Sequence, residues 1–253
     1  MVGLIFLLFN TVGFNNNGLS GTIPQNWPAN VENLWFQENI LSGTIPDSLS
    51  EITFLRELSL YRNCLTGTLP SSLGALSEVL VYISFNDNLL TGAIPVAFGN
   101  LTLLVFLYAN NNFFTGSVGG LQFVSPYVAN LDISSNMFTG SFPFNLADKS
   151  LVDLYLSNNE FSGAIGSDIN LLHLVENLDI SSNSFFGTLP TELKTVRKCV
   201  GVLVCWCVGL LYQICNITTY YIILILLCHY AIIGCEFAAS VTCLWQQLSR
   251  SIK

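Results

Sequence analysis

Eight asparagines recur along this chain of 253 residues, at successive spacings of 22, 24, 25, 24, 24, 23 and 24 residues. A carboxamide donates hydrogen bonds through its nitrogen and accepts them through its oxygen. A column of such groups can therefore satisfy backbone atoms in successive buried turns, where an unpaired group would cost several kcal/mol. The eight positions are Asn17, Asn39, Asn63, Asn88, Asn112, Asn136, Asn159 and Asn183.

The sequence contains no comparable pattern of residues that would indicate catalysis. There is no nucleophile string beside a base, no His-rich metal set and no phosphate-binding glycine loop followed by Lys. His173 stands in an apolar Leu-Leu-His-Leu string, where a structural role is expected. We therefore expect no enzyme activity, no cofactor and no metal site.

The asparagines must be positioned by a short strand that precedes each of them. The residues eight, five and three positions before Asn63 are Leu55, Leu58 and Leu60, and the other repeats follow the same pattern. A repeat of about 24 residues cannot bury such an apolar row alone, so neighbouring repeats must stack around one continuous core. Gly follows four residues after each Asn, where a Cβ would obstruct the chain. The sequence predicts a solenoid.

A second string identifies the kind of repeat. Leu-Ser-Gly-Thr-Ile-Pro occurs at 19–24 and 41–46, with close variants at 65–70 and 90–95. Over residues 4–193 the chain resembles the plant-type leucine-rich repeat, a family that includes receptor-like kinase ectodomains, receptor-like proteins and polygalacturonase-inhibiting proteins. The resemblance implies a right-handed, curved α/β solenoid with a concave parallel β-sheet and a short second row of strands. Pro should open an irregular or 3₁₀ segment, and a looser segment is expected where Gly119 and Gly166 replace it.

Binding is expected on the concave face. The strand residue between two inward-facing ones should point outward, which gives the series Gly13, Trp35, Ser59, Ser84, Tyr108, Asp132, Tyr155 and Asp179. Trp, Tyr and Arg most often anchor interfaces, so the candidate contacts are Trp35, Tyr61, Arg62, Tyr108 and Tyr155. Outward aromatic residues also stabilise sheets, and that alternative stays open. Asp132 and Asp179 lie in Leu-Asp-Ile-Ser-Ser-Asn strings, which favours a structural role.

Charge limits the class of partner. Residues 1–193 contain fifteen Asp or Glu and three Lys or Arg, a net charge of −12. Nucleic acid is excluded as a partner because no stripe of Lys and Arg is present. A peptide, a basic protein surface or a neutral glycan fits, and the resemblance adds a possible co-receptor. The same charge also favours solubility without implying a ligand.

The composition changes abruptly at residue 199, and the 37 residues from 199 to 235 contain no Asp, Glu, Lys or Arg. Nineteen residues at 217–235 would make about 28 Å of helix, against a hydrocarbon core of about 30 Å. The alternative to this single span is a hairpin of two spans, formed by residues 200–215 and 217–235. The predicted segments are an eight-repeat solenoid at 1–193, a basic juxtamembrane linker at 194–198, a transmembrane region at 199–235 and a tail at 236–253.

Two interpretations of function remain. The first is a membrane-anchored receptor-like protein that recognises a peptide, glycan or protein through its concave face and signals through a partner. Flanking basic residues mildly favour a cytosolic array, but the resemblance favours an extracellular array at the plasma membrane, with a glycan acceptor at Asn100 in an Asn-Leu-Thr triplet. The alternative is a soluble inhibitor or adhesion module, in which residues 199–253 are a gene-model artefact or a hydrophobic cap.

Overall fold

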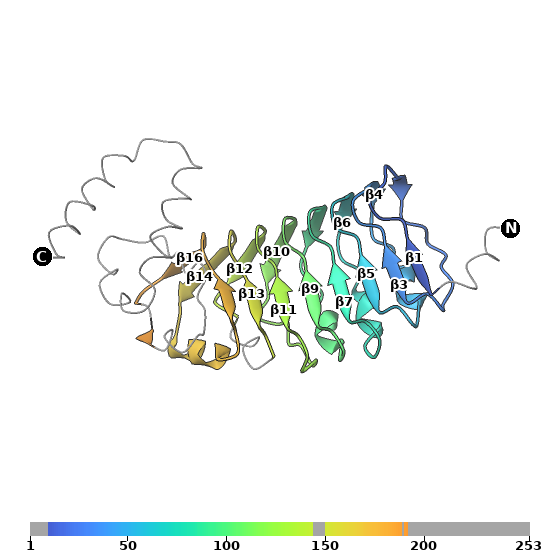
Figure 1. The fold of residues 1–253 in the computed structure, drawn as a ribbon. Helices are drawn as coiled ribbons and strands as arrows, with labels where there is room; N and C mark the ends of the chain where they lie inside the picture. Colours follow the sequence, from blue (N-terminus) through green and yellow to red (C-terminus); the bar gives the residue numbers. More distant parts are fainter. Residues whose placement is uncertain (1–9, 144–149, 189, 192–253) are drawn as a thin grey trace, which may run out of the picture. The chain divides into compact units, whose positions relative to one another are not determined.

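The computed structural model describes residues 10–143, 150–188 and 190–191, drawn in colour in Figure 1. The predicted linker, transmembrane region and tail at 194–253 lie outside these residues. Within the described ranges, no helix has the length and hydropathy that crossing a membrane requires.

The described chain forms eight coils. We number them by the eight recurring asparagines, from Asn17 in coil 1 to Asn183 in coil 8. Each coil adds one strand to each of two parallel eight-stranded sheets. The first sheet has the order β1-β3-β5-β7-β9-β11-β13-β15, so consecutive coils are neighbours throughout. The predicted solenoid and its parallel sheet are confirmed, and the implied second row of strands is present.

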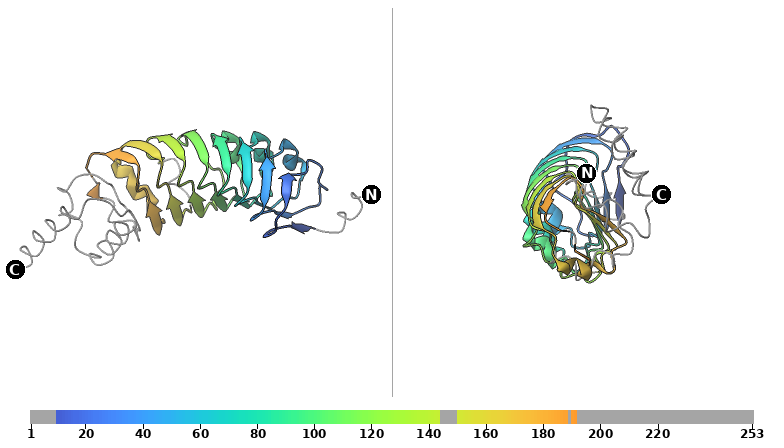
Figure 2. Two further views of the ribbon diagram at one scale, coloured as in Figure 1. Left: turned by 90° about the horizontal axis from the view of Figure 1, so that it is seen from above. Right: turned by 90° about the vertical axis from the view of Figure 1, so that its left-hand side faces the viewer.

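The strands of both sheets are short. Those of the first sheet are β1 (Thr11–Gly13), β3 (Asn33–Trp35), β5 (Glu57–Ser59), β7 (Tyr82–Ser84), β9 (Phe106–Tyr108), β11 (Asn130–Asp132), β13 (Asp153–Tyr155) and β15 (Asn177–Asp179). Those of the second are β2 (Ser20–Thr22), β4 (Ile40–Gly43), β6 (Cys64–Gly67), β8 (Leu89–Gly92), β10 (Phe113–Ser117), β12 (Met137–Gly140), β14 (Glu160–Ala164) and β16 (Ser184–Phe186). Figure 2 gives a view from above and a view along the array, in which successive coils lie one behind another with a progressive offset.

The core runs without interruption through all eight coils. The central residues of the first-sheet strands are at most 5% exposed, namely Val12, Leu34, Leu58, Ile83, Leu107, Leu131, Leu154 and Leu178. In the last four coils a second core position carries Phe114, Phe138, Phe161 and Phe185, whose rings stack with centroids 6.1, 6.4 and 6.3 Å apart. Each coil therefore buries its apolar side chains against its neighbours, as a one-dimensional repeat requires.

Short 3₁₀ helices follow the second sheet in four of the coils that the structure describes. They are η3 (Asp47–Glu51), η4 (Ser71–Ala75), η5 (Val96–Asn100) and η7 (Ser167–Leu172). Pro46, Pro70 and Pro95 precede the first three, with φ between −76° and −60°.

The two Gly replacements have different outcomes. The expectation of a looser segment after Gly166 is wrong, because η7 forms there with Ile169 and Leu172 buried. Burial of two apolar side chains fixes this segment without a proline. After Gly119 no 3₁₀ helix is found among residues 118–129, and the Gly119 N–H instead donates to Ser117 Oγ at 3.1 Å.

The asparagine side chains connect neighbouring coils. Asn112 Nδ2 donates to the carbonyl oxygens of Ala109 and Asn110 in its own coil, at 3.3 and 3.2 Å, and to that of Phe85 in the preceding coil at 3.0 Å. Its Oδ1 accepts the N–H of Leu90, also in the preceding coil, at 3.0 Å. One buried carboxamide therefore holds the turn of its own coil and makes two hydrogen bonds to the previous one.

The same set of contacts recurs from Asn39 to Asn183. Asn17 in coil 1 is exposed, and among the described residues its side chain donates to the carbonyl oxygens of Phe14 and Asn15 alone. The residue before each of the eight asparagines has a left-handed conformation, with φ between 52° and 59° at Asn16, Glu38, Arg62, Asp87, Asn111, Ser135, Asn158 and Ser182. The asparagine side chains thus stabilise a turn whose left-handed backbone conformation is unfavourable for most residue types.

We expect Asn112→Ala to lower the free energy of unfolding by roughly 3–5 kcal/mol, because the Leu90 N–H loses its buried acceptor and two coils lose their link. Asn112→Asp should cost at least as much near neutral pH, since its carboxylate would face three carbonyl oxygens. Urea unfolding of the full chain in mild detergent, followed by circular dichroism, measures both. Asn17→Ala is the matched control and should cost less than about 1 kcal/mol. Equal losses at Asn112 and Asn17 would show that the inter-coil bonds contribute nothing.

Candidate functional site

The exposed side of the first sheet carries two rows of side chains, because alternate strand residues point to the same side. The first residues of the strands form what we call the strand-start row, which comprises Thr11, Asn33, Glu57, Tyr82, Phe106, Asn130, Asp153 and Asn177. The last residues form the strand-end row, which comprises Gly13, Trp35, Ser59, Ser84, Tyr108, Asp132, Tyr155 and Asp179. The two rows together are the sheet face. Cα pairing keeps both rows in register from coil to coil.

Sequence reasoning identified the strand-end row and missed the strand-start row. The missed row adds two half-exposed aromatic residues, Tyr82 and Phe106. The signal was available, because a strand residue two positions before an outward one must also point outward.

Three aromatic rings gather over β7 and β9. The centroids of Tyr82 and Phe106 are 5.9 Å apart, as are those of Tyr82 and Tyr108, and those of Phe106 and Tyr108 are 6.3 Å apart. Ser84 lies in the same sheet and is only 1% exposed. Of the sequence-predicted contacts, Tyr108 therefore belongs to a packed aromatic cluster whose outer surface remains half-exposed.

The predicted contacts in coils 2 and 3 are already engaged within the protein. Trp35 Nε1 donates to Glu57 Oε2 on the next strand at 3.0 Å. Arg62 lies at the turn after β5, with Nη1 2.7 Å from Glu38 Oε1 and Nε 3.8 Å from Asp87 Oδ2. Its guanidinium carbon is 5.9 Å from the Tyr61 ring centroid. These pairs are largely exposed and contribute little to stability.

A different arrangement occupies coils 5–8. In the strand-end row, Asp132 pairs with Tyr108 on one side and Tyr155 on the other, and Tyr155 pairs with Asp179. We call these four residues the Tyr–Asp ladder, and all four are half-buried. The structure therefore places Tyr108 and Tyr155 in one continuous feature, apart from Trp35.

The ladder carboxylates each use one oxygen within the protein. Asp132 Oδ1 accepts the Ser134 N–H at 3.0 Å and the Ser134 hydroxyl at 2.6 Å. Asp179 Oδ1 accepts the Ser181 N–H at 3.0 Å. Within the described part of the chain, neither Oδ2 has a hydrogen-bond donor. The predicted structural role thus accounts for one oxygen of each carboxylate.

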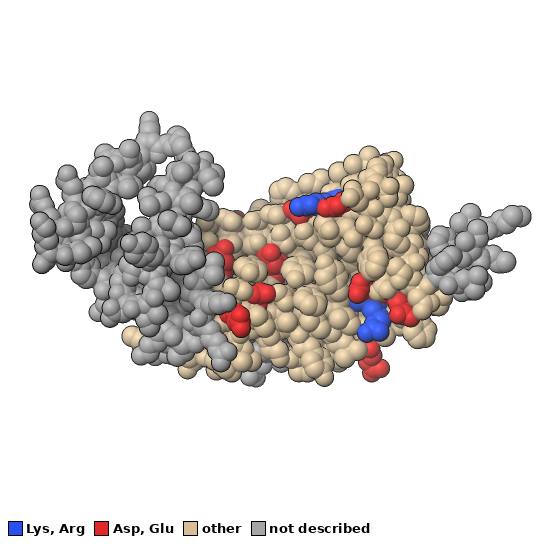
Figure 3. Space-filling model, viewed as in Figure 1, with Lys and Arg blue, Asp and Glu red and all other residues tan. Residues whose placement is uncertain are grey.

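Negative charge gathers here, and no Lys or Arg of the described ranges pairs with it. Between the two ladder aspartates, Asp153 of the strand-start row accepts hydrogen bonds from the side chains of Asn130 and Asn177. Figure 3 shows the acidic side chains over β11, β13 and β15, with Lys and Arg elsewhere on the visible face. Arg56 and Arg62 are the basic residues of the described ranges, and neither lies within 4.0 Å of a carboxylate oxygen of these three aspartates.

The local environment shifts several pKa values. Burial raises the pKa of the Asp132 carboxyl, the hydrogen bonds from Ser134 lower it, and the carboxylates of Asp179 and Asp87 raise it further. Burial also raises the pKa of the Tyr108 and Tyr155 phenols. Both rings are therefore uncharged near neutral pH, and their faces remain electron-rich.

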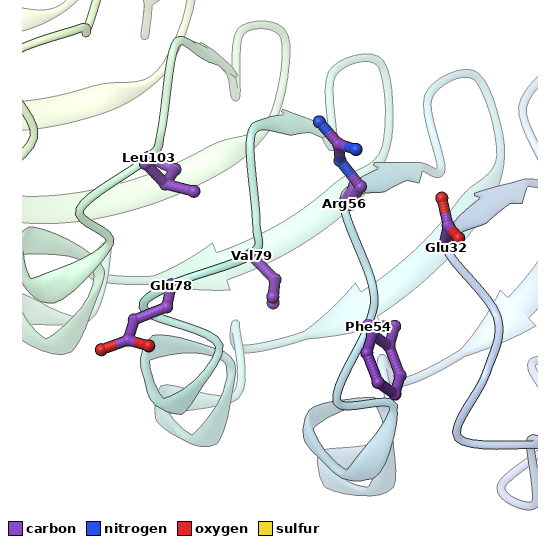
Figure 4. Close-up of a pocket in the computed structure, with 6 residues that line it drawn as sticks. All are labelled: Glu32, Phe54, Arg56, Glu78, Val79 and Leu103. Carbon is purple, nitrogen blue, oxygen red and sulfur yellow. The ribbon is translucent and has the colours of Figure 1, made fainter.

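A shallow hollow of about 370 Å³ lies where several first-sheet strands begin (Figure 4). None of the predicted contact residues lines it. Its lining combines three apolar and three charged residues and contains no nucleophile: Glu32, Phe54, Arg56, Glu78, Val79 and Leu103. The hollow offers no convergent set for chemistry.

The remaining sequence candidates are scattered. Asn100 is exposed at the end of η5, and its glycosylation stays a prediction. His173 is exposed, with Nδ1 3.0 Å from the Leu171 carbonyl oxygen. Among residues 10–143, 150–188 and 190–191, no three His, Cys, Asp or Glu side chains lie close enough together to hold a metal ion.

Known proteins resemble the chain in its repeat region. The Leucine Rich Repeat family profile matches residues 54–76 and 174–196. A probable LRR receptor-like serine/threonine-protein kinase of Arabidopsis thaliana is 32% identical over 98 residues, which is 39% of this chain and 9% of the kinase. The chain spans less than a tenth of the curated relatives it matches, namely 8%, 9% and 7% of their lengths.

Two solved structures extend the similarity over most of the chain. The plant peptide hormone receptor RGFR1, in complex with RGF2, superposes with a TM-score of 0.68 and 31% identity over 72% of this chain and 30% of that one. The ectodomain of the plant membrane receptor kinase GASSHO1/SCHENGEN3 of Arabidopsis thaliana, in complex with CASPARIAN STRIP INTEGRITY FACTOR 2, gives 0.66 and 27% over 74% and 23%. Both similarities cover less than a third of those larger chains.

The raised pKa of Asp132 predicts how stability depends on pH. The Asp132 carboxyl stabilises the fold fully at a pH below its unfolded-state pKa of about 3.8. That contribution is lost as the pH rises through the higher pKa of the folded state. Ionised Asp132 thus disfavours the folded state near neutral pH. Asp132→Asn keeps an oxygen acceptor for Ser134, so we expect an equal or higher melting temperature near neutral pH, with the relative gain shrinking as the pH falls.

Thermal melts of the Asp132→Asn chain from acidic to neutral pH, compared with melts of the unmodified full chain at each pH, check the prediction. Asp168→Asn is the matched control, because it removes the same charge from an exposed position on η7. A melting temperature for Asp132→Asn that falls below the parent near neutral pH would show that the ionised carboxylate stabilises the fold.

Proposed function

The array belongs to the plant leucine-rich-repeat ectodomain family of receptor-like kinases and receptor-like proteins, and we propose that it recognises an extended peptide through the sheet face. The observation that carries the proposal is the set of half-exposed aromatic side chains held in register on that face. Aromatic residues on a rigid support lose little conformational entropy on binding and often anchor interfaces. Recognition without chemistry is the proposed mode of action.

The dimensions of the face favour a peptide. Eight strands separated by about 4.7 Å give a surface about 33 Å long. A chain at about 3.3 Å per residue covers this length with about ten residues. The similar RGFR1 structure is itself a complex with RGF2, which supports a peptide rather than a glycan as the ligand.

Membrane anchoring through residues 199–235 is the second part of the proposal, with the array extracellular and a co-receptor transmitting the signal. The support is the absence of Asp, Glu, Lys and Arg from these 37 residues and the similarity to the ectodomain of a plant membrane receptor kinase. A soluble inhibitor or adhesion module is the alternative that the following fractionation experiment addresses.

We expect the full chain, expressed in plant cells, to remain in the membrane pellet after carbonate extraction. A variant that ends after residue 198 should move to the soluble fraction, because it lacks the charge-free segment. Immunoblotting of both fractions is the measurement. Recovery of the full chain in the carbonate supernatant would contradict anchoring and favour the soluble alternative.

Peptide recognition is tested by selecting a random-peptide display library on the detergent-solubilised full chain. We expect enriched peptides to bind about tenfold or more weakly to the Tyr108→Ala/Tyr155→Ala variant, because truncation removes two anchors from the face. Tyr127→Ala is the control, since Tyr127 is 56% exposed and lies outside both rows. Fluorescence anisotropy gives the affinities, and thermal melts verify folding. Failure to enrich any peptide, or equal losses in both variants, would refute the proposal.

A further inference from the structure

The Tyr–Asp ladder presents a regular alternation of aromatic ring and carboxylate across four adjacent strands. Its order across β9, β11, β13 and β15 is Tyr108, Asp132, Tyr155 and Asp179. Parallel strands lie about 4.7 Å apart, so like groups recur about every 9.5 Å. Tyr108 and Tyr155 thus flank Asp132, one on each neighbouring strand.

The charges of the ladder are uncompensated within the described part of the protein. That part contains thirteen Asp or Glu residues and two Arg, and Arg62 is already paired with Glu38. Asp132 and Asp179 each retain an Oδ2 without a donor, and Asp153 adds a third carboxylate between them. An approaching cation would therefore meet free acceptors.

The rings complement the same kind of ligand. A guanidinium or ammonium group gains from contact with a tyrosine face and from a charge-assisted hydrogen bond to a carboxylate. In the Tyr–Asp ladder, tyrosine and aspartate residues alternate on neighbouring strands. An anionic peptide would instead approach three carboxylates, and a neutral one would leave their charge unpaired.

The repeat distance also favours one backbone conformation in the ligand. A polyproline II helix rises about 3.1 Å per residue with three residues per turn, so residues i and i+3 lie on one side about 9.3 Å apart. This matches the step of about 9.5 Å between Asp132 and Asp179, which lie two strands apart. Basic residues three positions apart would thus reach both carboxylates at once.

We propose that the Tyr–Asp ladder binds a basic peptide in the polyproline II conformation, with Arg or Lys side chains at positions i and i+3 over Asp132 and Asp179. The inference rests on the proposed function, because it specifies the ligand of the same sheet face. It also reassigns Asp132 and Asp179, which sequence patterns had marked as structural, to a binding role through Oδ2.

The test titrates the full chain in mild detergent with fluorescent peptides built from Arg-Pro-Pro, Gln-Pro-Pro or Glu-Pro-Pro triplets, and with an isomer of the first in which the Arg residues are adjacent. We expect the Arg-Pro-Pro peptide to bind about tenfold tighter than the Gln-Pro-Pro peptide, through charge complementarity, with Glu-Pro-Pro weakest. The isomer should bind several-fold more weakly than Arg-Pro-Pro, and added salt should weaken Arg-Pro-Pro binding.

The decisive variant is Asp132→Asn/Asp179→Asn, which keeps both Oδ1 acceptors and should lose most of the preference for Arg over Gln. Glu51→Gln/Asp168→Asn is the matched control, because it removes the same charge from exposed positions on η3 and η7. Thermal melts monitor folding of both variants. The control should keep the preference, and equal losses in the two variants would overturn the proposal by reducing it to general electrostatics.

The outcomes separate this inference from the proposed function. Equal affinity for the Arg and Gln peptides, with both weakened by Tyr108→Ala, would refute the preference for a cation and leave the sheet face as a peptide-binding surface. Absence of binding by all the triplet peptides would also refute it, while the display selection decides the proposed function independently.

Discussion

The turn that follows each first-sheet strand enters the protein interior with backbone groups that no strand can satisfy. An unpaired buried amide or carbonyl costs about 1–3 kcal/mol, so a repeat protein must solve this problem once per coil. A carboxamide solves it because it carries donors and an acceptor on one short side chain. Asn63 serves the carbonyl oxygens of Leu60 and Tyr61 in its own coil while accepting the N–H of Leu41 from the coil before. The side chain that completes one turn therefore also joins its coil to the preceding one.

The column of asparagine side chains fixes the spacing between coils, on which the sheet face depends. Because every interior asparagine makes the same contacts to the preceding coil, the strands remain in register and the exposed rows repeat at the strand separation. Inward residues are constrained to be apolar by burial, whereas outward ones are free to vary without disturbing the core. The phenylalanine stack of coils 5–8 lies on the opposite, buried side of this division. Ligand chemistry can thus change on one side while the scaffold remains constant on the other.

The sequence specifies the scaffold more completely than the face. The asparagine spacing, the apolar strand positions and the Pro-led segments follow from periodicity, because each repeats eight times or nearly so. The strand-start row was missed although alternation implies it, and η7 forms after Gly166 because burial of Ile169 can replace the constraint of a proline. Pairings across coils could not be read from one repeat. The bond from Trp35 to Glu57 joins residues 22 positions apart and depends on the register of two strands.

The carboxylate of Asp132 is not explained by its contacts within the array. Its hydrogen bonds from Ser134 all reach Oδ1, and an asparagine oxygen at the same place could accept them. The negative charge adds a cost, since burial raises the pKa of this carboxyl and the nearby Asp179 raises it further. Removing the charge would keep the turn and relieve that cost. A residue whose structural task an uncharged side chain could perform, and whose second oxygen lacks a donor within the described chain, is accounted for by a cation that arrives from outside.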